Sequence, residues 1–244
     1  MFHLTIVLLL SVLCHTTHGI SKLPPYIKPC SQSVPNFNEC AIKNGREALS
    51  TVVKGDPKYH IPCLDPLKLD KISLQGSDNL QLYAEDLQLI GLKSAEIMDI
   101  DWNLNSKTIK IEIHIPEMRA IGQYNLDGRV LIMNLKGTGR MNNTHYNCQI
   151  LMNCSYDVYN RKDKEYIKIT NITIEFLNEK SHFQFSNLLN NQQISDQMNS
   201  FLNENSEVVV KETMPSINKV IQTVTLSVLN PLVEKIPLEE IVTA

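Results

Sequence analysis

The chain has 244 residues, a formal net charge of −3 and a pI of about 6.2, a balance that excludes the broad basic surface typical of nucleic-acid binding. Hydrophobic residues make up 43% of the chain and charged residues 20%, which is the composition of a folded protein rather than a disordered one. The length predicts one domain or two small ones.

An apolar run at residues 4–13 (LTIVLLLSVL) precedes the polar letters CHTTHG. The run is shorter than the ~20 apolar residues that cross a bilayer, and it has the length of the hydrophobic segment of a signal peptide. Thr17 and Gly19 supply small residues for cleavage. We therefore predict a leader over 1–19, one domain over 20–244, and secretion without a stable membrane anchor.

The cysteines that follow the predicted leader are expected to form disulfides, because an exported chain meets an oxidising compartment. Cys30 and Cys40 are the natural local pair, since they flank a turn-rich segment. Cys148 and Cys154 can pair with each other only if the chain turns between them, because an unbroken strand holds them ~20 Å apart. Cys63 is an alternative partner for either, and one thiol is left over. No CxxC or HExxH spacing is present, so no metal site is expected.

The first regular element after the leader is predicted to be a helix. Asn36 or Asn38 is placed to cap it, and Gly55-Asp56-Pro57 is a stop signal. Its apolar residues are Ala41, Ile42, Ala48, Leu49, Val52 and Val53.

A strand-rich region is predicted from Leu67 to about Phe185. Its clearest strand covers 107–115, where every second residue is isoleucine, and such strict alternation indicates an antiparallel sheet with one buried face. The parity of the leucines changes between Leu82 and Leu87, which predicts a bulge or turn. Asp127-Gly128 is a hairpin signal. Further strands are expected at 97–104, 120–126, 129–135 and 166–177.

From Asp196 the apolar residues follow helical spacing and predict up to ~40 helical residues, with a kink or break at Pro215. The stretch 220–233 is apolar on nearly all sides, and a helix of that kind is expected to be wrapped by other elements. We therefore predict an α+β fold in which a strongly curved antiparallel sheet wraps a long C-terminal helix. That geometry can leave an elongated apolar cavity.

Motifs of enzymes are absent from the sequence: it contains no GxSxG, no P-loop and no GxGxxG after a strand. Asp99 and Asp101 share a strand face, where a solvent-facing pair is the simplest interpretation. We expect neither enzyme activity nor a cofactor. A lipid-ester hydrolase is the less favoured alternative, since a catalytic triad forms only in three dimensions.

The candidate ligand-binding residues are large apolar side chains of the predicted strands and helices, and core packing explains each of them equally well. Tyr124 is the candidate polar group that orients a ligand, with surface exposure as its alternative. Asn142, Asn153 and Asn171 begin glycosylation sequons, which a secreted chain can use. The apolar candidates are Trp102, Ile109, Ile111, Ile113, Met198, Phe201, Leu202 and Ile221.

Several segments, in this order along the chain, resemble the insect juvenile hormone-binding protein and takeout family of secreted lipophile carriers. Cys30 and Cys40 lie where that family has its N-terminal disulfide. The other matching segments are IPCLDPL at 61–67, YNLDGRVL at 124–131 with GTG at 137–139, DQMNSFLNEN at 196–205, Met214-Pro215, and KIPL at 235–238.

The resemblance implies a lipid-transfer (TULIP-like) fold with a tubular cavity for a terpenoid, fatty-acid-like or quinone-like ligand. Cys63 departs from the family motif, and Cys148 and Cys154 are not part of the takeout pattern. The leading hypothesis is a secreted, monomeric, non-enzymatic carrier of a small hydrophobic molecule. The alternative is an extracellular interaction or signalling protein, of circadian or feeding output, whose cavity is structural or vestigial.

Overall fold

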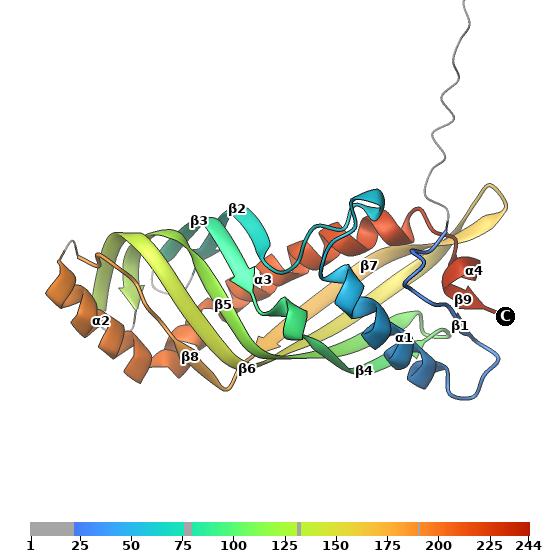
Figure 1. The fold of residues 1–244 in the computed structure, drawn as a ribbon, viewed down its shortest axis with the longest axis horizontal. Coiled ribbons are helices and arrows are strands. Elements are labelled where there is room, and N and C mark those ends of the chain that lie inside the picture. The colour runs from blue at the N-terminus through green and yellow to red at the C-terminus, as the bar shows by residue number, and fades with distance from the viewer. Residues whose placement is uncertain (1–21, 76–79, 131–132, 190) are drawn as a thin grey trace, which may run out of the picture.

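A computed structural model of the chain describes residues 22–75, 80–130, 133–189 and 191–244. A large antiparallel sheet runs along the long axis of the molecule, with helices at both ends and a long helix along the sheet (Figure 1). The predicted leader at 1–19 lies outside the described residues.

Seven strands form the main sheet within the described part of the chain, in the order β2-β3-β5-β6-β7, with β4 paired to β5 and β8 paired to β6. Neighbouring strands are antiparallel throughout, as the isoleucine alternation predicts. The strands are β2 Leu67–Gln75, β3 Gln81–Ile90, β4 Glu96–Asn103, β5 Thr108–Val130, β6 Met133–Arg161, β7 Lys164–Leu177 and β8 Lys180–His182.

β5 and β6 are the longest strands and connect the two ends of the molecule. β5 pairs with β4 through its first half and with β3 through its second half. The parity of the buried positions changes in both long strands at Pro116 and Asn147, from Ile115 and Cys148 to Met118 and His145. This change fits the missing N–H of proline and the positive φ of Asn147, +48°.

The parity change of the leucines is confirmed as a bulge in β3. The β3–β5 register shifts between Glu85 and Gln88, and Asp86 has a φ of +50°. The hairpin prediction at Asp127-Gly128 is wrong, because both residues lie inside β5 and pair with β6 up to Val130. A local turn signal was overridden there by a long run of strand pairing.

The N-terminal helix α1 spans Phe37–Val52, close to its prediction, and Asn36 is its N-cap residue. The Asn36 amide donates to the Glu39 carboxylate rather than capping a helix N–H. α1 lies along β4, where the Arg46 guanidinium donates to the backbone carbonyl of Ile97 at 2.7 Å. The short elements nearby are β1 Cys30–Ser31, η1 Pro57–Tyr59 and η2 Leu92–Ser94.

Two C-terminal helices replace the single broken helix of the prediction. α2 spans Gln192–Glu204 and α3 spans Ser206–Val233, so the break lies at Asn205 and not at Pro215. The Asn205 amide nitrogen donates to the Phe201 carbonyl, which closes α2, while its own carbonyl accepts the N–H groups that begin α3. Pro215 is on the exposed side of α3, where water can satisfy the carbonyl that loses its partner.

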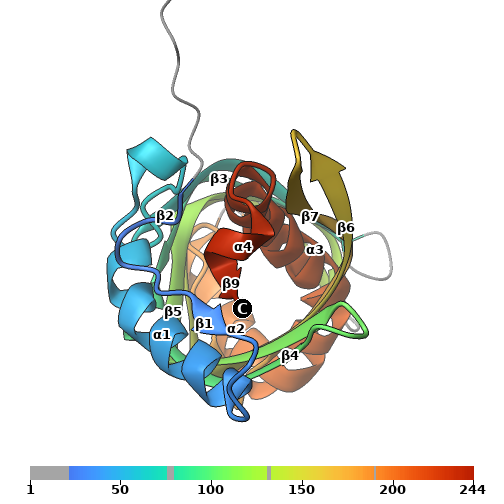
Figure 2. The same ribbon diagram turned by 90° about the vertical axis from the view of Figure 1, so that its right-hand side faces the viewer.

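The sheet curves around α3, as the view along the long axis shows (Figure 2). α3 contacts β7 and β2, the strands at opposite ends of the main strand order, and thereby closes the curved sheet. The Asn218 side-chain oxygen accepts the Phe176 N–H at 2.9 Å, and the Gln222 amide donates to the Ile172 carbonyl at 2.7 Å. The predicted α+β fold, with a long helix held inside a curved antiparallel sheet, is confirmed.

Candidate functional site

The inner face of β5 carries the candidate site. Ile109, Ile111 and Ile113 point to the same side as Ile115, which is 0% exposed, yet all three keep part of their surface accessible. Their partners on β6 are Cys154, Met152 and Ile150, which form a second row on this face. Apolar side chains that face inward without being fully covered are the candidates for contact with a ligand between the sheet and α3.

α3 supplies the opposite wall. Ile221 packs against two hydrophobic clusters, one around Ile115 and Phe176 and the other around Met152, and Ile150 packs against the same two clusters. Its neighbours along the helix are also apolar and only partly buried: Ile217, Val224, Leu226, Val228 and Leu229. We call this region, from Ile109–Ile113 across to Ile221, the open half of the molecule.

Trp102 and Tyr156 lie at the outer end of the open half. The Trp102 indole N–H donates to the Tyr156 hydroxyl at 3.0 Å, and the indole ring meets Phe37 of α1 edge-on at 5.6 Å between centroids. Trp102 pairs with Ile109 across β4 and β5, so these aromatic rings continue the isoleucine face. Burial raises the pKa of Tyr156, which keeps its hydroxyl protonated.

Tyr124, Leu202 and Met198 lie at the other end, in a region that we call the closed half. Tyr124 and Leu202 are 3% and 2% exposed and belong to one core cluster with Phe185 and Leu188, against which Met198 packs. The Tyr124 hydroxyl donates to the Ser186 carbonyl at 2.6 Å, and burial raises its pKa to about 12. Phe201 is partly exposed on α2. The structure therefore divides the candidates between two regions.

The segment that carries Ser186 fills the closed half because two glycines let it approach the sheet. A Cβ on Gly139 would come within 2.5 Å of the Ser186 carbonyl oxygen, and one on Gly137 within 2.9 Å of the Asn187 carbonyl oxygen. The GTG letters at 137–139 thus mark a close backbone contact inside β6.

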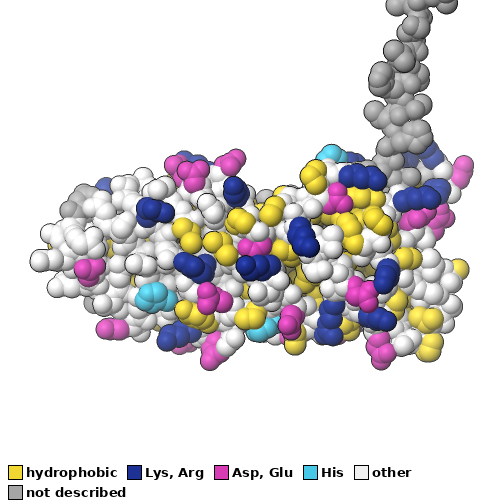
Figure 3. Space-filling view, viewed as in Figure 1, with side chains coloured by type: hydrophobic (Ala, Val, Ile, Leu, Met, Phe, Trp, Pro, Cys, Tyr) yellow, Lys and Arg dark blue, Asp and Glu magenta, His cyan; other side chains and the backbone are white. Residues whose placement is uncertain are grey.

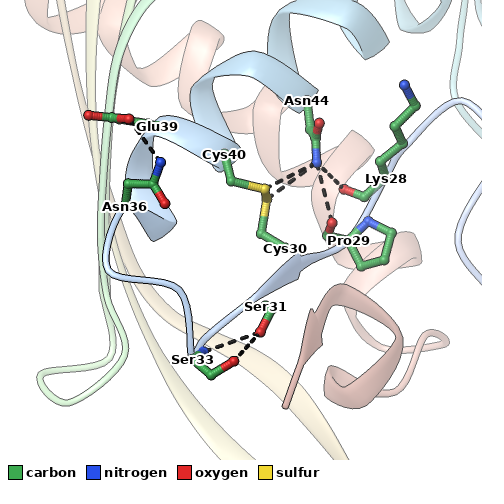
Figure 4. Close-up of a disulfide and its surroundings, with 9 residues drawn as sticks. All are labelled: Lys28, Pro29, Cys30, Ser31, Ser33, Asn36, Glu39, Cys40 and Asn44. Carbon is green, nitrogen blue, oxygen red and sulfur yellow. Dashed lines mark hydrogen bonds between the residues drawn. A yellow bond between two sulfur atoms is a disulfide. The ribbon is translucent and has the colours of Figure 1, made fainter.

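The two chain ends of the described structure cover the outer end of the open half. β1 pairs in parallel with β9, Val242–Thr243, which follows the short helix α4, Leu238–Ile241. Cys30 and Cys40 form the expected disulfide and fix β1 to α1, and the Asn44 amide donates to both sulfurs and to the carbonyl of Lys28 (Figure 4). A covalent link and a two-residue strand pair therefore anchor this end.

The remaining described cysteines are free thiols. Cys148 and Cys154 face inward on unbroken β6, so the chain makes no turn that would join them, and Cys63 is exposed. Burial raises the pKa of Cys148 to about 12, and burial also raises the pKa of Cys154. Both inner thiols are consequently neutral and contribute apolar surface.

A buried serine–histidine pair bears on the hydrolase alternative. The Ser181 hydroxyl and His145 Nδ1 are 2.8 Å apart, and the Asn178 amide donates to the same hydroxyl. Both residues are buried, and the imidazole ring lies edge-on to Phe176 and Phe183. Burial lowers the pKa of His145 to about 4, so the ring is neutral near pH 7. A pair enclosed in this way serves packing, because a substrate does not reach it.

Two surface hollows, of about 550 and 380 Å³, lie in the closed half. The larger one holds the ion pair of Lys136 and Asp127, 2.7 Å apart, and the smaller one is lined by Glu85, Gln123 and Thr138 among others. Both hollows have charged or polar side chains in their lining, which an apolar ligand would have to desolvate. Hydrophobic side chains instead gather on the surface toward the end with α1 and the last turns of α3 (Figure 3).

Neither a metal site nor a membrane span is found among the described residues. No group of three or more His, Cys, Asp or Glu side chains in that part of the chain is placed to hold a metal ion. Within the same residues, no helix has the length and apolar character needed to cross a membrane.

Comparison with known proteins identifies the family to which the chain belongs. The chain matches the family model described as haemolymph juvenile hormone binding protein over residues 7–243. The circadian clock-controlled protein daywake of Drosophila yakuba is 21% identical over 244 residues, covering 95% of this chain and 93% of that protein. A putative beta-carotene-binding protein of Schistocerca gregaria is 24% identical over 114 residues, 46% of each chain.

The crystal structure of Takeout 1 from Epiphyas postvittana superposes with a TM-score of 0.80 and 27% sequence identity, covering 89% of this chain and all of that one. The fold, with its long helix inside a curved sheet, thus recurs in a solved relative. The chain belongs to the haemolymph juvenile hormone binding protein family, which includes the takeout proteins.

Proposed function

We propose that this protein is a secreted carrier that binds one small hydrophobic molecule between α3 and the sheet of the open half. The observation that carries the proposal is the inward-facing but incompletely covered apolar wall of Ile109, Ile111, Ile113 and Ile221. Membership in a family of hydrophobic-ligand carriers supports the same function. Trp102 completes the proposed wall, and Tyr124, Met198, Phe201 and Leu202 are left out of it.

The binding energy in this proposal comes from desolvation. Burying ~300 Å² of apolar ligand surface is worth ~7 kcal/mol at ~25 cal/mol per Å², before the entropic cost of association. The described wall offers isoleucine, leucine and valine side chains and neutral thiols, none of which demands a charged partner. A terpenoid or fatty-acid-like molecule fits such a wall better than a polar metabolite.

Tyr156 is the group that we propose orients the ligand. Its oxygen already accepts the Trp102 indole N–H, and no acceptor for its own hydrogen is found among the described residues. Tyr124 is not available for this role, because its hydroxyl hydrogen is donated to Ser186. A protonated hydroxyl beside an apolar wall can donate to an ester, ketone or ether oxygen of the ligand.

Secretion forms part of the proposal. The apolar run of the leader predicts export, and the Cys30–Cys40 disulfide suits an oxidising compartment. The family description refers to haemolymph, an extracellular fluid. The natural ligand is proposed only as a class.

The first experiment is native mass spectrometry of protein secreted from insect cells, followed by organic extraction and identification of any released molecule. Purified protein is then titrated with farnesyl acetate and with farnesene, two terpenoids that differ in an ester group. Stoichiometric binding of either supports the carrier. Absence of binding to both, in folded protein stripped of ligand, would favour the surface-interaction alternative instead.

Two pairs of variants locate the site. Ile113→Trp places a large ring in the open half and is expected to weaken binding of both probes more than tenfold, whereas Met98→Trp, at an exposed position of β4, leaves it unchanged. Tyr156→Phe is expected to weaken farnesyl acetate binding by roughly 3- to 10-fold, the value of one neutral hydrogen bond, and to leave farnesene binding unchanged. Tyr83→Phe, at a partly exposed side chain of β3, is the matched control.

A further inference from the structure

Two of the three sequons lie side by side on β6 and β7. Asn153-Cys154-Ser155 pairs in antiparallel register with Asn171-Ile172-Thr173, so that Asn153 is opposite Thr173 and Ser155 is opposite Asn171. The middle residues, Cys154 and Ile172, are opposite each other and buried in the inner face. Because side chains alternate across a strand, both asparagines point outward, and both are exposed.

The third sequon lies in a different environment. The Asn142 side chain is partly buried, and its amide oxygen accepts a hydrogen bond from the Arg119 guanidinium at 3.2 Å. Its hydroxyl residue, Thr144, is buried and pairs with His182 of β8. The Asn142 backbone N–H donates to Gln184, so a further chain segment lies against this position. A glycan here would have to displace interactions that the other two positions lack.

We propose that Asn153 and Asn171 carry N-linked glycans as an adjacent pair on the outer face of the sheet, and that Asn142 carries none. The inference rests on the proposed secretion, because the glycans are added only to an exported chain. Diagonal neighbours on paired strands are ~7–8 Å apart, so the first sugars of the two glycans lie next to each other.

The glycan pair covers the outside of the wall whose inside forms the open half. Lys110 of β5 is directly opposite Asn153, and the Lys110 side chain is 64% exposed in the bare protein. The sugars shield this lysine and close the outer face of β5, β6 and β7 to protein partners. A partner protein, if the carrier delivers its ligand to one, then docks elsewhere on the molecule.

The test uses the full chain expressed in insect cells, with protein collected from the medium and from the cell lysate. Intact mass before and after enzymatic removal of N-glycans counts the glycans, and tandem mass spectrometry of glycopeptides assigns them. We expect two glycans on each secreted chain. Ser155→Ala is expected to remove only the glycan at Asn153, Thr173→Ala only that at Asn171, and Thr144→Ala neither.

A glycan on Asn142, or secreted protein in which Asn153 or Asn171 is unoccupied, overturns the inference and leaves the carrier function intact. Chain retained in the lysate with its leader uncleaved and no glycan overturns both proposals.

Shielding is measured by the rate at which an amine-reactive reagent labels Lys110. That rate is expected to rise several-fold after glycan removal, while Lys71, 62% exposed and also in an ion pair, reacts at an unchanged rate. Equal rates before and after removal would contradict the shielding.

Discussion

The closed and open halves share the same long strands, yet the inward-facing candidate residues of β5 are fully buried only in the closed half. In the closed half, α2 and the segment around Phe185 and Leu188 cover the inner face, and Tyr124 and Leu202 are sealed in the core. In the open half, α3 lies opposite the inner face and α1 packs against β4, where Phe37 meets Trp102, yet Ile111 stays partly exposed. The comparison shows that strand alternation decides which side chains face inward, while the packing of the covering segments decides how completely they are buried.

Ile115 and Ile111 provide the sharpest test of this difference, since they share a residue type, a strand and a face. Ile115→Ala empties a fully buried position and is expected to lower the free energy of unfolding by about 3 kcal/mol. Ile111→Ala, next to existing space, is expected to cost about 1 kcal/mol, because it removes partly exposed surface and creates little new cavity. Chemical denaturation measures both. Equal losses would mean that the open half is as densely packed as the rest.

The sequence was sufficient for the alternation, the bulge in β3 and the wrapped helix, because each depends on local spacing. It failed where distant segments decide the outcome. The Tyr124 hydroxyl is not available to a ligand because it donates to the carbonyl of Ser186, a residue far along the chain. The Tyr156 hydroxyl accepts the Trp102 N–H instead. The residues next to Tyr124 and Tyr156 in the sequence predict neither contact. The hairpin at Asp127-Gly128 and the break at Pro215 failed for the same reason, since strand pairing and solvent exposure override local signals.

His145, between the two halves, is expected to make stability depend on pH. Burial lowers its pKa to about 4 in the folded chain, whereas an unfolded histidine titrates near 6.5, so the unfolded chain binds more protons between these values. Folding stability is therefore full above pH 6.5 and falls as pH drops toward 4, by on the order of 1.4 kcal/mol per pH unit. Denaturation of wild type and His145→Gln at pH 7.0, 6.0 and 5.0 measures the slope. The variant should lose most of the slope in this range; an unchanged slope would assign the effect to other groups.

Asparagine side chains of α2 and α3 hydrogen-bond to the backbone of neighbouring segments, and they make different numbers of bonds in the two halves. This difference gives a third test. In the closed half, Asn203 of α2 both accepts the Phe183 N–H and donates to the Phe183 carbonyl. In the open half, Asn218 of α3 accepts only the Phe176 N–H. Asn203→Ala is expected to cost about 2 kcal/mol and Asn218→Ala about 1 kcal/mol, in proportion to the backbone groups left unpaired. Hydrogen exchange at the Phe183 and Phe176 amides reports each helix contact separately. Equal losses of protection at the two amides would contradict the larger effect expected for Asn203→Ala.

The smallest effect on stability is expected at the outer end of the open half, where it should be accompanied by an effect on ligand exchange. Lys164 of β7 forms an exposed ion pair with Glu239 of α4, and the nearby Arg161 guanidinium donates to the Glu234 carbonyl. Exposed ion pairs contribute little to folding, so Lys164→Ala should leave the denaturation midpoint almost unchanged.

If ligand leaves past α4, loosening the contact between Lys164 and Glu239 speeds release of farnesyl acetate a few-fold in stopped-flow displacement. Lys71→Ala removes a comparable ion pair with Glu85, remote from α4, and should alter neither quantity. Equal release rates in both variants would place the ligand's path elsewhere, because the contact at α4 would then not limit its departure.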